Sequence, residues 1–131
     1  MQEKPEKPRF QSGLQKSPGR LKIIPWVQMN SQVKEELVRI IAEIESFIVD
    51  NGGIFSDWYV GITEDVQERL HRYHNVKDTC VFVKAPSMVF ADIIEKYFIE
   101  ERKTDGGTGG GNYSDIYVYA YKKQDYTKET D

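Results

Sequence analysis

The chain has 131 residues, of which 39% are apolar, 30% charged and 12% aromatic, proportions typical of one globular domain with a real core. Its 18 basic and 21 acidic residues give a formal net charge of −3, which argues against a uniformly basic nucleic-acid coat protein, so any phosphate site must be local. No apolar run reaches the roughly 18 to 20 residues of a membrane span, and no signal-peptide pattern follows Met1. With the lone Cys80, these features predict a cytoplasmic protein without a membrane partner.

Charge is unevenly distributed along the chain. Residues 1–27 contain six basic residues, two acidic residues and four prolines, whereas the rest contains 12 basic and 19 acidic residues. We interpret 1–27 as a basic tail, flexible in part, that either follows phosphates or forms a solvated arm, and we favour the arm. Its apolar end, residues 21–27, is expected to dock as an extra edge strand. Residues 28–123 then form the domain and 124–131 a polar C-terminal tail.

The first predicted elements are a helix and a strand. Apolar residues recur at helical spacing from Ser31, a favourable N-cap, to Ile48, and Gly52 and Gly53 supply the stop. The segment Trp58–Ile62 is short, aromatic and β-branched, which predicts a strand.

Two more helices enclose a second strand. Thr63 is placed to cap a helix that begins at Glu64, the second strand covers Thr79–Val83, and Ser87 caps a helix to about Arg102. The buried stripe of the earlier helix is expected to be Val66, Leu70 and Tyr73. The inward residues of the later helix are expected to be Phe90, Ile93, Ile94, Tyr97 and Phe98.

The last part of the chain combines a breaker and a strand. Asp105–Asn112 contains five glycines, typical of a mobile flap or a tight reversal. Ile116–Tyr121 alternates aliphatic residues with tyrosines, which predicts a strand with one aliphatic and one aromatic face. Such tyrosines either stack on unpaired bases or cover a helix or form a cross-strand ladder, and we favour the structural role over base stacking. The fold class is therefore α+β, a small antiparallel or mixed sheet flanked by helices.

The candidate site begins on the first predicted strand. Tyr59 and Gly61 share one face of that strand, and the missing side chain of Gly61 is expected to leave space for a ligand beside the phenol. Arg69 lies two turns into the next helix, where its guanidinium can reach over the sheet. Arginine suits phosphate because it stays charged and can bond two oxygens.

These residues resemble the GIY-YIG nuclease superfamily. Its second motif strand reads Tyr-Ile/Val-Gly and is followed by an Arg ten residues after the Tyr, the spacing of Tyr59 and Arg69. The family carries a metal-binding Glu on a later helix, and Glu95 is similar to it. Because no basic residue lies three or four positions after Glu95 and Ala91 is small, we expect an accessible carboxylate.

The resemblance implies a metal-dependent endonuclease that hydrolyses phosphodiester bonds of nucleic acid, in the first place DNA. It implies that Tyr59 helps to deprotonate the attacking water, that Arg69 stabilises charge on the phosphate and that His74 shares the proton transfer. Glu95 would hold one Mg²⁺ or Mn²⁺, with the remaining ligands from water and substrate. Weaker substrate-binding candidates are Gly61, Arg72, Asn112, Tyr117 and Tyr119. Arg69, Arg72, Tyr59 and Glu95 should converge on one cleft.

The first motif strand of the family, Gly-Ile-Tyr, has only the short segment Gly53–Phe55 as a counterpart. We hypothesise that the C-terminal strand Ile116–Tyr121 pairs with Trp58–Ile62 in its place, and that Tyr117 or Tyr119 supplies the missing phenol. The alternative function is a catalytically degenerate module of the same fold that binds nucleic acid or another protein. A partner protein or a homodimer could direct either form to its target.

Overall fold

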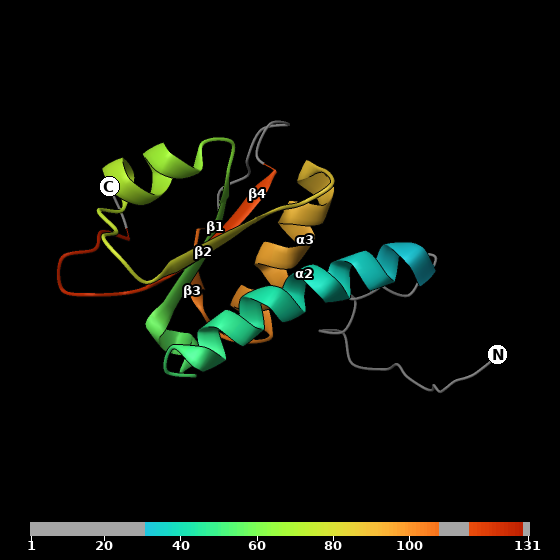
Figure 1. Ribbon diagram of the computed structural model, residues 1–131, viewed down its shortest axis with the longest axis horizontal. Helices are drawn as coiled ribbons and strands as arrows, with labels where there is room; N and C mark the ends of the chain where they lie inside the picture. The colour runs from blue at the N-terminus through green and yellow to red at the C-terminus, as the bar shows by residue number, and fades with distance from the viewer. Residues whose placement is uncertain (1–30, 108–115, 130–131) are drawn as a thin grey trace. The chain divides into compact units, whose positions relative to one another are not determined.

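The computed structural model describes residues 31–107 and 116–129 (Figure 1). Contacts within the chain define two units, Met1–Glu35 and Glu36–Asp131, and the second contains all of the strands among the described residues. Within residues 31–107 and 116–129, no helix combines the length and apolar character needed to cross a bilayer.

Two predictions concern parts of the chain outside the described residues. The first is the basic tail over 1–27, together with its apolar segment at 21–27. The second is Asn112, which belongs to the undescribed stretch 108–115. Both stay predictions.

The first helix, α2, spans Ser31–Asp50, and the predicted helix, with periodicity from Ser31 to Ile48, is confirmed. Gly52 and Gly53 follow it with φ angles of +125° and +77°, values that glycine adopts without a steric penalty. The amide of Gly53 donates to the carbonyl of Ile48 at 2.9 Å, so these glycines end the helix as the sequence predicted. The buried residues of α2 from the second unit are Leu37, Ile40, Ile41, Ile44 and Ile48.

The strands form one mixed sheet in the order β2-β4-β1-β3. A short 3-10 helix, η2 (Phe55–Asp57), leads into β1 (Trp58–Thr63), and β1, β2 (Cys80–Lys84) and β4 (Tyr117–Lys122) each start and end within one residue of their predictions. β4 pairs antiparallel with both β1 and β2, whereas β3 (Asp105–Gly106) pairs parallel with β1. The α+β class is confirmed as a four-stranded mixed sheet with two main helices.

The second main helix, α3, spans Met88–Glu100 and ends two residues before the predicted Arg102. The hydroxyl of Ser87 accepts a hydrogen bond from the amide of Phe90 at 3.3 Å, so the predicted N-cap is confirmed. The helix turns Ala91, Ile94, Glu95 and Phe98 inward. Of the other residues predicted to face inward, Phe90, Ile93 and Tyr97 are half-buried.

The cap predicted for the helix between β1 and β2 was wrong. Thr63 is the last residue of β1, paired with Tyr117, and the helix starts at Val66. Asp65 is the cap, because its carboxylate accepts from the amide of Glu68 at 3.1 Å, while the Thr63 hydroxyl accepts from the amide of Asp65 at 3.0 Å. Thr63 is fixed in the sheet by its pairing with Tyr117 and lies three residues before the helix begins at Val66. Its hydroxyl therefore accepts from the amide of Asp65 and not from an amide of the helix.

Most of this helix is a π-helix, η3 (Glu68–Tyr73). The amide of His74 donates to the carbonyl of Arg69, five residues earlier, at 3.0 Å. Val66 and Leu70 are buried as predicted, whereas Tyr73 is half-buried. π-helical turns are rare and frequently occur at functional sites, so this segment is a candidate part of the functional site.

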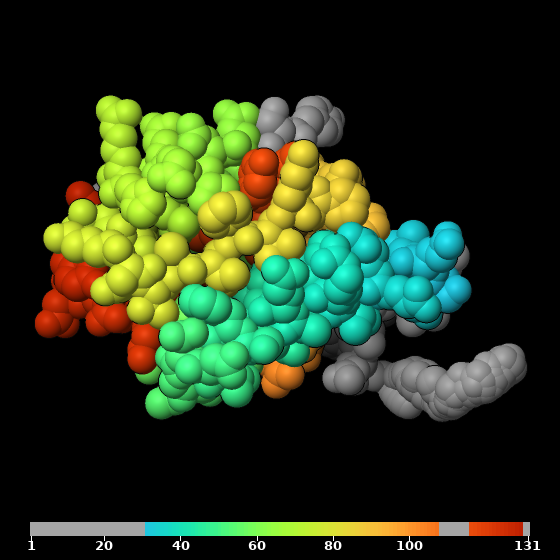
Figure 2. Space-filling model, viewed as in Figure 1, coloured from blue at the N-terminus to red at the C-terminus, as the bar shows by residue number. Residues whose placement is uncertain are grey.

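The sheet separates two different interiors. Successive residues of a strand point to opposite faces, so Val118 and Ala120 of β4 lie on one face and Tyr119 and Tyr121 on the other, as predicted. Figure 1 shows α2 and α3 side by side on one side of the sheet and the η3 helix on the other, and the Tyr97 hydroxyl of α3 donates to Glu45 of α2 at 2.7 Å. Figure 2 shows edge strand β2 at the surface between the η3 helix and α2.

Candidate functional site

Tyrosines from two strands meet on the face of the sheet that the η3 helix covers. In the β1/β4 pair, Tyr59 lies opposite Tyr121 and Gly61 opposite Tyr119. The rings of Tyr59 and Tyr121 are stacked with centroids 5.3 Å apart, and those of Tyr59 and Tyr119 are 6.3 Å apart. The hypothesis that the C-terminal strand pairs with Trp58–Ile62 is therefore confirmed.

The space beside Gly61, expected to be open for a ligand, is occupied by another side chain. A Cβ atom at Gly61 would lie 2.5 Å from the hydroxyl oxygen of Tyr119 and 2.6 Å from its Cζ. The expected open space for a ligand is thus filled by the Tyr119 ring, and that expectation was wrong. Tyr117 lies one pair further along, opposite Thr63, and its ring contacts Phe82 with centroids 6.2 Å apart. Of the two candidate phenols, Tyr119 is the one beside Tyr59.

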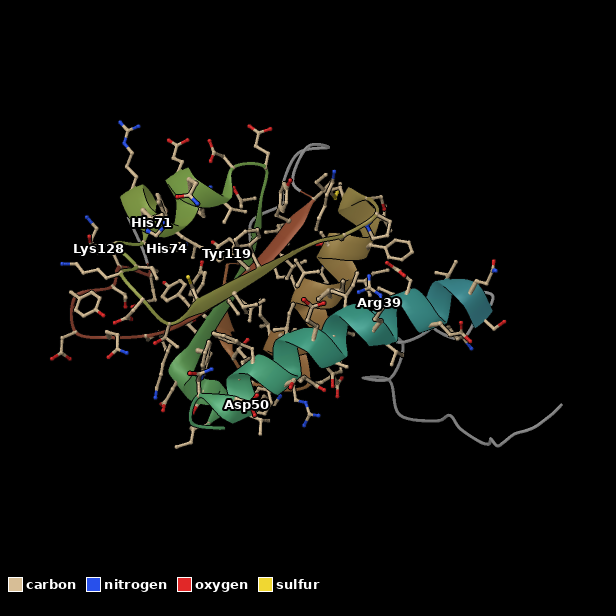
Figure 3. The ribbon with its side chains drawn as sticks, in the orientation of Figure 1. Arg39, Asp50, His71, His74, Tyr119 and Lys128 are labelled. Atoms are coloured by element: carbon tan, nitrogen blue, oxygen red, sulfur yellow. The ribbon has the colours of Figure 1, made fainter. Side chains whose placement is uncertain are left out.

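His74 is the centre of this group of tyrosines and is fully buried. Its Nε2 lies 2.8 Å from the Tyr119 hydroxyl, and its Nδ1 lies 2.6 Å from the carbonyl oxygen of Lys128 and 3.0 Å from the Tyr121 hydroxyl. Figure 3 shows His74 between Tyr119 on β4 and Lys128 of the C-terminal segment. We call Tyr59, His74, Tyr119 and Tyr121 the Tyr–His cluster.

Burial determines the charge of His74. It lowers the pKa of the imidazole, and the positive charge of Arg69 lowers it further, while the Lys128 carbonyl and the negative charge of Glu129 oppose both effects. The net direction is downward from the ordinary value of 6.5. The ring is therefore neutral near pH 7 and able to accept a proton.

The two arginines of the η3 helix have different surroundings. Arg69 is half-buried, its guanidinium lies over the ring of Tyr73, 4.3 Å from the ring centroid, and its charge acts on both Tyr59 and His74. The side chain of Arg72 is 83% exposed and forms an ion pair with Glu68 at 3.8 Å. The expected convergence therefore includes Arg69 and not Arg72, which lies on the solvent side of the helix.

The exposure of Glu95 also differs from the prediction. It is only 5% exposed, because it projects from the inward side of α3, so the prediction of an accessible carboxylate was wrong. Burial, followed by the negative charges of Glu95 and Asp105, raises the pKa of Tyr59 to about 12, although Arg69 opposes this. The Glu95 carboxylate and the Tyr59 phenol therefore belong to one electrostatic environment.

The possible metal ligands of the described residues are not clustered. Within 31–107 and 116–129, no three His, Cys, Asp or Glu side chains are grouped so that they could hold a metal ion. A closed structural zinc site, which needs four protein ligands, therefore does not fit these residues. Mg²⁺ is commonly bound through only one or two protein carboxylates beside substrate phosphates, and Glu95 is the carboxylate that the family resemblance assigns to it.

The C-terminal segment is a part of the site that the sequence did not indicate. Residues 124–131 were assigned to a polar tail, yet Lys128 contacts His74 and the carboxylate of Glu129 accepts from the Tyr121 hydroxyl at 2.8 Å. The contact between His74 and Lys128 spans 54 positions of sequence. Local periodicity carries no signal for such a contact.

Comparison of the chain with protein-family models, with curated proteins and with solved structures finds no match. The function is therefore argued from the residues and geometry of the site.

Proposed function

We propose that the domain is GIY-YIG-like and hydrolyses phosphodiester bonds of nucleic acid, DNA first, with Mg²⁺ or Mn²⁺. One observation carries the proposal. Strand β4 pairs with β1 so that Tyr119 lies against Gly61, beside Tyr59, with His74 in hydrogen-bond contact with Tyr119. Tyr59 and Gly61 of the motif strand thus lie beside Tyr119 and His74.

The strand arrangement supports the resemblance in a specific way. In the family, the first motif strand forms a hairpin with the Tyr-Val-Gly strand, and here β4 pairs antiparallel with that strand from the other end of the sequence. Tyr119 on β4 then supplies the second phenol. The order from β1 through the η3 helix and β2 to α3 follows the order expected of the family.

The charges favour His74 over Tyr59 as the group that takes a proton. Tyr59, with a pKa of about 12, is protonated near neutral pH, whereas the lowered pKa of His74 keeps its ring neutral. A base that is neutral and ready to accept a proton at the working pH is the more efficient one. In this proposal Tyr59 positions the attacking water by hydrogen bonding, and His74 accepts its proton through the hydroxyl of Tyr119.

Arg69 and Glu95 supply the remaining functions. The Arg69 guanidinium lies beside the cluster and can pair with phosphate oxygens as charge accumulates on them. Glu95 would hold the divalent cation, which adds positive charge at the phosphate. The same cation would offset the carboxylate charge that raises the pKa of Tyr59.

The test is cleavage of labelled duplex and branched DNA with Mg²⁺, with Mn²⁺ and with a chelator. We expect Tyr59→Phe and Glu95→Gln to lower the cleavage rate by about 100-fold or more, the range that positioned acid–base and metal groups contribute. Tyr97→Phe and Glu43→Gln delete the same chemical groups on α3 and on the exposed side of α2 and should cleave like wild type. Cleavage that survives in Tyr59→Phe and Glu95→Gln would refute the assignment of the site.

Burial of the cluster favours a second candidate, a module of the same fold that binds nucleic acid without cutting it. Tyr59, Tyr119 and Glu95 are 7%, 2% and 5% exposed, which limits access of a phosphate to the reacting groups. This candidate predicts salt-dependent DNA binding that Arg69→Ala weakens, with no cleavage under any metal condition. Absence of binding as well would leave a protein-interaction module.

A further inference from the structure

The backbone of Lys128 holds His74 from two directions. The Lys128 amide donates to the His74 carbonyl at 2.8 Å, and the Lys128 carbonyl lies 2.6 Å from Nδ1 of the His74 ring. One residue of the C-terminal segment thus fixes both the main chain and the side chain of His74 (Figure 3).

The segment is itself held in place by several contacts. The side-chain amide of Asn75 donates to the Tyr126 carbonyl at 2.9 Å, and the Tyr126 hydroxyl lies 3.3 Å from the carboxylate of Asp78. Within the segment, the Gln124 amide donates to the hydroxyl of Thr127 at 3.0 Å, and Thr127 is buried. Segment 124–129 is therefore a defined turn docked on the loop that follows η3.

These contacts decide which nitrogen of His74 carries the proton. A carbonyl oxygen only accepts hydrogen bonds, so Nδ1 must be the donor to Lys128. Because the ring is neutral, Nε2 then has a lone pair and accepts from the Tyr119 hydroxyl at 2.8 Å.

Glu129 removes the competing arrangement. The Tyr121 hydroxyl lies 3.0 Å from Nδ1 and would favour the opposite tautomer if it donated there. Its single hydrogen goes instead to the carboxylate of Glu129 at 2.8 Å. A carboxylate is the stronger acceptor because it is charged, so the Tyr121 oxygen faces Nδ1 as an acceptor.

We propose that segment 124–129 is a positioning element of the site. Through the Lys128 carbonyl and the Glu129 carboxylate it holds His74 as the Nδ1–H tautomer and keeps Nε2 as the acceptor for Tyr119. The consequence for catalysis rests on the proposed function, whereas the tautomer itself does not.

The tautomer determines whether proton transfer can occur. With Nε2 unprotonated, the Tyr119 proton moves to Nε2 while a water proton moves to the Tyr119 oxygen. The water oxygen forms a new bond to phosphorus and the bond from phosphorus to the leaving oxygen breaks. The leaving oxygen takes up a proton from solvent, and the imidazolium later releases one. In the opposite tautomer Nε2 already carries a proton, so this transfer is blocked.

The test is ¹⁵N NMR of the His74 side chain in the full-length protein without DNA, with cleavage measured in parallel. We expect protonated Nδ1 and unprotonated Nε2 in wild type. Glu129→Ala frees the Tyr121 hydrogen, for which Nδ1 at 3.0 Å is a nearer acceptor than the Lys128 carbonyl at 3.4 Å. We expect a measurable population with protonated Nε2 in this variant, and cleavage lower by about tenfold.

Two further variants separate positioning from general damage to the fold. Glu129→Gln retains an acceptor oxygen and should keep the wild-type tautomer. Adding Tyr121→Phe to Glu129→Ala removes the competing donor and should restore it. Wild-type protein with protonated Nε2, or Glu129→Ala with an unchanged tautomer, would overturn the proposal. If wild type shows the expected tautomer and cleaves no DNA, the proposed function fails and the positioning of His74 stands.

Discussion

The two faces of the sheet are built from the same strands and stabilised by different forces. On the α2 and α3 side, β4 contributes Val118 and Ala120, both fully buried and apolar. On the η3 side it contributes Tyr119 and Tyr121, which share hydrogen bonds with His74. Packing on the first face depends on volume, and packing on the second also depends on the direction of each donor and acceptor.

This difference places apolar packing and a buried hydrogen-bond network on different faces of one small sheet. On an apolar face, a cavity lowers the free energy of unfolding, and no hydrogen bonds fix the positions of protons. A buried polar face requires a partner for each donor and acceptor, so the change of one group alters the others. Of the candidate functional residues, Tyr59, His74 and Tyr119 lie on the second face, whereas Glu95 projects from the inward side of α3.

The largest change in the free energy of unfolding is expected for a substitution on the aliphatic face. Phe98 of α3 is fully buried, and Phe98→Ala should lower the free energy of unfolding by about 3 to 5 kcal/mol through lost burial and the cavity that remains. Urea denaturation followed by circular dichroism measures the loss. A loss below about 1 kcal/mol would mean that Phe98 of α3 does not pack into this core.

On the aromatic face, the contact between Gly61 and Tyr119 gives the next largest effect. In Gly61→Ala the new methyl group would lie 2.5 Å from the Tyr119 hydroxyl oxygen, so the ring must move at a cost of about 1 to 3 kcal/mol. Gly107→Ala is the matched control, because its methyl group would lie 3.0 Å from the Tyr59 hydroxyl alone. Equal unfolding free energies for the two variants would show that Tyr119 does not require glycine at 61.

The pH dependence of stability tests the burial of neutral His74. Because its folded pKa lies below 6.5, the unfolded chain binds more protons between the two pKa values. Stability is therefore complete above pH 6.5 and decreases as the pH falls toward the folded pKa, by at most about 1.4 kcal/mol per pH unit. His74→Gln should lose this dependence in denaturation series from pH 7.5 to 5, and an unchanged slope in the variant would assign the effect to another group.

The smallest change in the free energy of unfolding is expected for a substitution of Arg72. Its side chain is 83% exposed and its partner Glu68 is 60% exposed, so Arg72→Ala should change the free energy of unfolding by less than about 0.5 kcal/mol. Arg69→Ala serves as the comparison, since it removes the charge that lowers the pKa of Tyr59 and His74. Larger destabilisation in Arg72→Ala than in Arg69→Ala would reverse the assignment of the two arginines.

Sequence reasoning predicted the elements that depend on periodicity. It found α2, α3 and the three longer strands, because apolar spacing and the two-residue alternation of β4 are local signals. The pairing of the C-terminal strand with Trp58–Ile62, which the structure confirms, was instead inferred from the missing counterpart of the family's first motif strand. It missed β3, since a glycine run indicates a break. At Gly106, however, a Cβ atom would lie 2.6 Å from the carbonyl oxygen of Val60, so close strand pairing requires glycine there.

The site was predicted less completely, for physical reasons. Tyr59 and Arg69 follow a fixed spacing, and His74 was found beside them. The burial of Glu95 and the outward direction of Arg72 depend on how whole elements pack. The contact of Lys128 with His74 closes a loop of 54 positions, and this contact brings Glu129 beside Tyr121. Such contacts become visible only in three dimensions.

The most direct measurement of the central claim is to determine two quantities for Tyr59→Phe beside wild type: the rate of Mg²⁺-dependent DNA cleavage and the free energy of unfolding. The account predicts a fall in cleavage of about 100-fold with stability changed by less than about 1.5 kcal/mol, because Phe keeps the packed ring and only one hydroxyl is removed. Cleavage that is unchanged, or that falls only as far as the folded fraction falls, would contradict the assignment of chemistry to the aromatic face.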